Sequence, residues 1–174
     1  MADTALVVMV PEAEPYVSAL RERYDPAAAA GVPAHITVLF PFVPFEQLSS
    51  DVLKRIDLIS ASIHPFDFHL SSFARFTHCF YLKPEPAQPF IDLTSHVVAE
   101  FPAYLPYCGL FDSIIPHLTV AQGSEDDLIE AERLLNSVHP VLGFDCRCDS
   151  LVLIENSTGR WAQNALFKLA SRRE

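Results

Sequence analysis

Two segments with the same pattern of residue types constrain what this chain can fold into. Residues 35–38 read His-Ile-Thr-Val and residues 117–120 read His-Leu-Thr-Val, and a proline lies just upstream of each, at Pro33 and Pro116. Because side chains alternate between the two faces of a β-strand, the histidine and the threonine of each segment point to the same side. The sequence therefore predicts two strands that each carry a His/Thr face.

The two histidines and two threonines are the candidate catalytic residues. Brought together around a cleft, they can hold one phosphate, and phosphodiester chemistry needs a base, an acid on the opposite side of phosphorus, and hydrogen-bond donors. His35 and His117 suit proton transfer because the pKa of imidazole lies near neutrality. The hydroxyls of Thr37 and Thr119 can donate to phosphate oxygens. The alternative is a pair of structural histidines and two β-branched strand residues.

The remaining elements follow an order that occurs twice: a helix, a His/Thr strand, a helix and a hairpin. Apolar spacing predicts helices over 12–24, 46–63, 89–101 and 124–138. Alternation predicts strands over 6–10, 35–42, 66–70, 79–83, 116–121, 144–154 and 161–169, with an Ala-rich loop over 25–33. We therefore expect an α+β fold of two lobes, mainly antiparallel sheets with helices packed outside, pseudo-duplicated around a central cleft.

The length of 174 residues, half of them hydrophobic, predicts one domain with a sizeable core. We expect this domain to span 1–174, with lobes of roughly 1–87 and 88–174. The longest uncharged stretch, 26–45, contains four prolines and reads as loop plus strand rather than a membrane span. The N-terminus lacks the features of a signal peptide, so we expect a cytoplasmic protein, and a monomer, with no membrane partner.

The net charge of −10 bears on the kind of partner. No run of Lys or Arg exceeds two residues, whereas proteins that grip long nucleic acid usually show a basic patch. The charge favours a small nucleotide or an RNA terminus as the substrate and disfavours DNA. A local basic cleft stays compatible with it, because net charge does not say where charges lie.

The four cysteines, Cys79, Cys108, Cys146 and Cys148, are expected to be reduced and buried. A metal or redox site built on them is the competing interpretation. The spacing Cys-x-Cys is not that of common zinc sites, and no His-Glu-x-x-His motif occurs. No metal and no cofactor are therefore expected. Motifs of phosphate-binding and dinucleotide-binding loops are also missing, which disfavours an ATP-dependent ligase.

The residues around both motifs match those of a known family. The flanks are Gly-Val-Pro-Ala at 31–34, Leu-Phe-Pro-Phe at 39–42, Phe-Tyr-Leu-Lys-Pro at 80–84 and Phe-Asp-Ser-Ile-Ile-Pro at 111–116, with Trp161, Phe167 and Leu169 in the last strand. Over nearly its whole length the chain resembles the 2H phosphoesterase superfamily, which includes 2′-5′ RNA ligase-like proteins and cyclic nucleotide phosphodiesterases. That family is defined by two His-x-Thr/Ser-x motifs, one in each lobe.

The resemblance implies a metal-independent phosphodiesterase for 2′,3′-cyclic nucleotides, RNA ends or 2′-5′ bonds, with ligation as the reverse of cleavage. For opening of a cyclic phosphate it implies His117 as the base that acts on water and His35 as the acid, and the reverse direction swaps these roles. Thr37 and Thr119 are implied to bind phosphate. The rival hypothesis is a non-catalytic protein that binds a nucleotide or an RNA end.

Three further residues are candidates for substrate binding. Many relatives carry an arginine three residues after the second motif threonine, where this chain has Gln122, so a weaker grip on a highly charged RNA end is expected. Phe111 and Trp161 are the candidates to test for stacking on a base, although packing in the core is the favoured interpretation for each. The other histidines are assigned to the surface or to structural roles: His64, His69, His78, His96 and His139.

Overall fold

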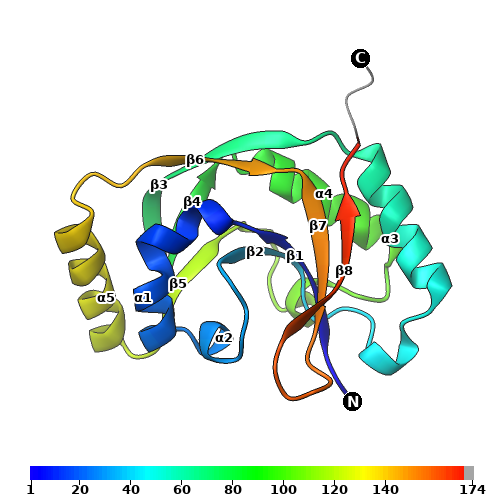
Figure 1. The fold of residues 1–174 in the computed structure, drawn as a ribbon, viewed down its shortest axis with the longest axis horizontal. Helices are drawn as coiled ribbons and strands as arrows, with labels where there is room; N and C mark the ends of the chain where they lie inside the picture. The colour runs from blue at the N-terminus through cyan, green and yellow to red at the C-terminus, as the bar shows by residue number, and fades with distance from the viewer. Residues whose placement is uncertain (171–174) are drawn as a thin grey trace.

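Eight antiparallel strands form one continuous sheet that curls into a half-barrel, as a computed structural model of the chain describes for residues 1–170 (Figure 1). The strand order is β6-β3-β4-β5-β2-β1-β7-β8. The strands are β1 (Thr4–Met9), β2 (His35–Leu39), β3 (Phe66–Phe76), β4 (Cys79–Glu85), β5 (Leu118–Gln122), β6 (Phe144–Cys148), β7 (Ser150–Glu155) and β8 (Ala162–Lys168). The α+β class with antiparallel strands and helices outside the sheet is confirmed.

Four longer helices pack on one face of this sheet. They are α1 (Glu14–Tyr24), α3 (Ser50–Ser62), α4 (Gln88–Glu100) and α5 (Glu125–Val138). Helices α1 and α5 lie beside β4 and β5, and α3 and α4 lie toward the other end of the sheet (Figure 1). The chain also forms the short helix α2 (Pro26–Ala29) and three 3-10 turns, η1 (Pro11–Ala13), η2 (Phe45–Gln47) and η3 (Pro106–Gly109). None of the helices of residues 1–170 is long and apolar enough to cross a bilayer.

The strands alternate between a helix-covered face and an opposite face, here called the open face. In β1, Leu6 and Val8 join the main core beneath the helices. Their neighbours Ala5 and Val7 point the other way, into a smaller apolar cluster over β1 and β7. Both faces of β1 are covered, and its sequence is apolar from residue 5 to residue 9, as is usual for a strand buried on two sides.

The two halves of the sheet do not follow a division of the chain at residue 87. The half β6-β3-β4-β5 and the half β2-β1-β7-β8 each combine strands from before and after that point. The motif strands β2 and β5 meet at the centre, where the two halves join. The duplicated order of elements therefore produces neighbouring central strands rather than two separate sheets.

Several predicted segments differ from the structure, among them the strand expected over 66–70, which extends to Phe76 as β3. The expected loop 25–33 contains α2, because Pro26 suits a first helical position and the Asp25 carboxylate accepts the backbone N–H of Ala27 as an N-cap. The expected strand 144–154 is divided at Asp149 into β6, which pairs with β3, and β7, which pairs with β1 and β8. The break lets the chain change neighbours within the sheet.

One buried ion pair links α1 to the segment before β2. The Arg21 guanidinium donates to the Asp25 carboxylate at 2.9 and 3.0 Å and to the carbonyl of Val32 at 3.2 Å, and both charged side chains are almost wholly buried. Burial of two opposite charges is tolerated because they are paired and hydrogen-bonded.

We predict that Arg21→Met lowers the free energy of unfolding by about 3–5 kcal/mol, because it leaves the buried Asp25 carboxylate without its partner. Urea unfolding followed by circular dichroism measures the change. The matched control is Arg133→Met, which removes an exposed pair with Glu130 and should leave the unfolding midpoint nearly unchanged. Equal midpoints for both variants would contradict the prediction.

Candidate active site

The four motif side chains lie together on the open face, where β2 meets β5. Ile36 pairs with Leu118 in the antiparallel register, so His35 faces Thr119 across the strands and Thr37 faces His117. Ile36 and Leu118 are fully buried on the helix-covered face. The alternation predicted from sequence thus places two His/Thr faces side by side, although His117 lies just before the first residue of β5.

Each histidine ring is oriented by a backbone carbonyl two residues upstream. The Nδ1 atom of His35 donates to the carbonyl of Pro33 at 2.8 Å, and that of His117 donates to the carbonyl of Ile115 at 2.7 Å. Since a carbonyl only accepts, Nδ1 carries the hydrogen in both rings. In the neutral ring Nε2 then has a free lone pair, so each histidine is prepared to exchange a proton through Nε2.

Burial makes both histidines harder to protonate than a free imidazole. It lowers the pKa of His35 to about 4, against the opposing effect of the bond to the Pro33 carbonyl, and the Arg21 charge lowers the pKa further. Burial also lowers the pKa of His117, again partly offset by its carbonyl bond. Both rings are therefore neutral at pH 7 in the free protein.

Tyr107 is a residue of this site that the sequence did not single out. Its hydroxyl shares a hydrogen bond with Thr37, and its backbone N–H donates to the carbonyl of Phe40 at 2.6 Å. Tyr107 and Cys108 both have positive φ, at 50° and 57°, which costs a non-glycine residue roughly 1–3 kcal/mol. Tyr107 and Thr37 are 70 positions apart in the sequence and come together only in the folded chain, so no local sequence pattern indicates their contact.

Aromatic rings surround His117 on the β4 side. Phe76 and Tyr81 lie edge-on to its imidazole, with ring centroids 5.3 and 5.4 Å away, and they stack on one another at 4.4 Å. The register places Tyr81 opposite Thr119. These rings account for part of the desolvation of His117, because they replace water at its edges.

The other candidate residues are placed near the site but do not join the His/Thr group. Phe111 is 67% exposed and contacts Tyr107 edge-on at 5.7 Å, so packing of Phe111 in the core is excluded. Trp161 is half-buried against Phe40 at 6.0 Å. Gln122 is exposed at the end of β5, opposite Cys79.

The cysteines are free thiols. Cys79, Cys146 and Cys148 are buried as expected, but Cys108 is exposed in η3, which corrects the expectation for that residue. Burial raises the pKa of both Cys146 and Cys148 to about 12, so these two stay protonated at neutral pH. Within residues 1–170 no three metal-ligating side chains are grouped as a site.

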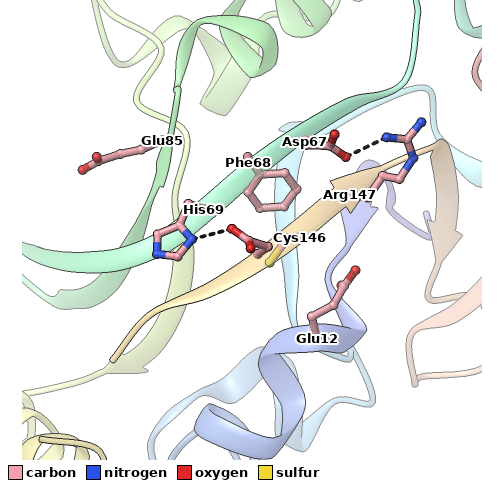
Figure 2. Close-up of a pocket in the computed structure, with 8 residues that line it drawn as sticks. Glu12, Asp67, Phe68, His69, Glu85, Cys146 and Arg147 are labelled. Atoms are coloured by element: carbon pink, nitrogen blue, oxygen red, sulfur yellow. Dashed lines mark hydrogen bonds and ion pairs between the residues drawn. The ribbon is translucent and has the colours of Figure 1, made fainter. Parts of the chain in front are cut away.

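A hollow of about 530 Å³ lies elsewhere, at the edge strand β6 and its neighbour β3 (Figure 2). Two pairs of polar side chains join across the two strands, His69 with Asp145 at 2.8 Å and Arg147 with Asp67 at 2.6 Å. Glu12 approaches from η1, beyond Cys146 (Figure 2). Exposed cross-strand pairs of this kind contribute little to the free energy of unfolding, and this one places His69 at the surface.

Comparison with known proteins identifies the family. Residues 9–160 match the model of the 2′-5′ RNA ligase superfamily. The chain belongs to this superfamily, the 2H phosphoesterases. Among members of the superfamily, a Bacillus cereus protein provisionally named a phosphoesterase is 31% identical over 166 residues, 86% of each chain. A Bacillus licheniformis protein with the same provisional name is 32% identical over 114 residues, 62% of each chain.

Solved structures share the superfamily fold. A Thermus thermophilus protein superimposes with a TM-score of 0.64 at 17% identity, covering 98% of this chain and all of the other. Escherichia coli LigT, solved in complex with 3′-AMP, superimposes with a TM-score of 0.61 at 16% identity, covering 97% of this chain and 98% of LigT. At such low sequence identity, these similarities establish the fold of this chain but not its substrate or its reaction.

We predict that His35 and His117 both carry their hydrogen on Nδ1 at pH 7, and that His35 titrates with a pKa of about 4. Long-range ¹H–¹⁵N correlation spectra distinguish protonated Nδ1 from protonated Nε2, and His35→Ala and His117→Ala provide the assignments. A hydrogen on Nε2 of either ring would contradict the proposed orientation.

Proposed function

We propose that this protein is a metal-independent phosphodiesterase that acts on 2′,3′-cyclic nucleotides, cyclic-phosphate RNA ends or 2′-5′ phosphodiester bonds. The observation that carries the proposal is the pair of Nδ1-anchored histidines, His35 and His117, on neighbouring strands with Nε2 free. Threonine hydroxyls face both rings across those strands. Membership of the 2H phosphoesterases supports phosphoester chemistry at this site.

In hydrolysis of a 2′,3′-cyclic phosphate, water attacks phosphorus in line with the oxygen that leaves. One imidazole takes a proton from the water as its oxygen bonds to phosphorus, and the other gives a proton to the ribose oxygen as its bond to phosphorus breaks. Thr37 and Thr119 donate to the non-bridging oxygens, where negative charge increases. The two imidazoles supply both proton transfers, so the proposed reaction needs no metal ion.

The roles of the two histidines follow the family expectation, with His117 as the base and His35 as the acid for ring opening. The low pKa of His35 in the free protein means that it must gain its proton as substrate binds. The negative charge of a bound phosphate favours this, because an opposite charge nearby raises the pKa of imidazole. For bond formation in the reverse direction the roles exchange.

Nucleotides are the proposed class of substrate. Escherichia coli LigT has been solved with 3′-AMP, with ATP and with NADP+, which supports a site in this fold that accepts nucleotides. The net charge of −10 favours a nucleotide or a chain terminus over a long nucleic acid.

We predict that His35→Ala and His117→Ala each lower kcat by roughly 10²–10⁴-fold, because each removes one proton-transfer group. The assay offers 2′,3′-cyclic mononucleotides, cyclic-phosphate-ended RNA and 2′-5′-linked dinucleotides in the presence of EDTA. The matched control is His96→Ala on α4, whose Nδ1 also donates to a backbone carbonyl, that of Asp92 at 2.7 Å. This variant should retain full activity.

Two outcomes would overturn this assignment. Wild-type rates in either site variant would show that the imidazole is dispensable, and loss of activity on adding EDTA would show that a metal ion takes part. Tight binding of nucleotides without turnover at any pH would favour the rival, a protein that binds a nucleotide or an RNA end without catalysis.

We predict that kcat/KM passes through a maximum below pH 6.5. The reacting complex needs one neutral and one protonated imidazole, and in the free enzyme the pKa of each is lowered from 6.5, so the proton is taken up more readily at lower pH. Activity therefore falls at high pH as the acid loses its proton, and at low pH as the base gains one. Initial rates with a 2′,3′-cyclic nucleotide from pH 4 to pH 9 measure this, and a maximum above pH 7 would contradict it.

A further inference from the structure

Phe76 is a large aromatic side chain that touches His117 and still reaches solvent. It lies at the end of β3, next to the tight turn to β4, and is 38% exposed. Its ring meets the imidazole edge-on, with an angle of 87° between the planes, and stacks on Tyr81 with an angle of 27°. A ring supported on one side and accessible to solvent is suited to receive another flat group.

The register puts Phe76 on the same side of the sheet as the phosphate-binding candidates. Phe76 pairs with Cys79, and Tyr81, two residues further along β4, pairs with Thr119. Because residues two apart in a strand share a face, Phe76 and Tyr81 lie on the open face beside Thr119. The ring therefore borders the place where a phosphate would lie.

A second phenylalanine of the same strand provides a contrast. Phe73 is 36% exposed, close to the value for Phe76, but it pairs with Leu82 and contacts Phe80, both buried in the core beneath the helices. Phe73 thus belongs to the opposite face of β3. The two side chains match in type, strand and exposure and differ in which face they occupy.

The charges near the site make such a flat surface useful. The one cation whose charge lowers the pKa of His35 is Arg21, which is already paired with Asp25. Gln122 occupies the position where many relatives carry an arginine. Without an arginine at that position, binding of a nucleotide gains more from contact with its base, and aromatic stacking is the sequence-tolerant way to obtain that contact.

We propose that Phe76, supported by Tyr81, is the stacking surface for the base of the nucleotide whose phosphate lies between His35 and His117. The position of that phosphate rests on the proposed function. The ring accepts any base, and it favours purines over pyrimidines because a purine overlaps it more fully. The substrate class is therefore a mononucleotide or a terminal nucleotide, recognised through its base rather than through a chain of phosphates.

The experiment compares two ligands by calorimetric titration, 3′-AMP and ribose 3-phosphate, which lacks the base. Phe76→Ala should weaken binding of 3′-AMP by about 5- to 150-fold, the range for loss of one stacked base. It should change binding of ribose 3-phosphate by less than about twofold, and Phe73→Ala should change neither by more than that. Phe76→Leu, which keeps much of the apolar volume, tests the same point should Phe76→Ala fold poorly.

Three outcomes would overturn the proposal. Phe76→Ala could weaken binding of both ligands equally, which would mean that Phe76 acts only by positioning His117. It could leave binding of 3′-AMP unchanged, or the wild type could fail to bind 3′-AMP. Because binding is measured without turnover, the result is independent of the proposed reaction. If the protein turns over no diester but Phe76→Ala still weakens binding of 3′-AMP and not of ribose 3-phosphate, the stacking surface is supported and the proposed function fails. If the enzyme turns over a diester and Phe76→Ala binds 3′-AMP normally, the proposed function stands and the stacking surface is ruled out.

Discussion

The pairing of β2 with β5 is the contact on which the rest of the site depends. It is a short pairing at the centre of the sheet, and it brings together segments that are 82 residues apart in sequence. Backbone hydrogen bonding of these strands sets which residues face each other, and a shift of β2 by one residue would turn its two motif side chains to the opposite face. The burial of Ile36 and Leu118 opposes such a shift, because it would move His35 and Thr37 into the apolar core.

The buried charged side chains near this pairing are paired with one another. Arg21 and Asp25 form a closed ion pair, the imidazoles are neutral, and the hydroxyls of Thr37 and Thr119 carry no charge. An imidazole of this site becomes charged when a bound phosphate favours its protonation. The acid and base states are thus coupled to the presence of the substrate.

Local patterns in the sequence were sufficient for the elements that depend on local interactions. The alternation at 35–38 and 117–120 predicted the His/Thr faces, and apolar spacing over 124–138 predicted α5, which begins in the structure with a reciprocal capping box between Ser124 and Asp127. What local patterns could not predict depends on distant partners. The division at Asp149 follows from a change of strand neighbours, and the contact of Tyr107 with Thr37 arises from the closure of the fold.

The carbonyl that orients each imidazole belongs to the same short segment as the imidazole, two residues before it. Proton placement on each ring is therefore a property of its own strand, whereas the separation of the two rings is a property of how the sheet curls. A homologue could lengthen or flatten the sheet, and so accommodate a larger ester, while retaining the same tautomers. In this architecture the reactivity of the site and the size of what fits into it can vary independently.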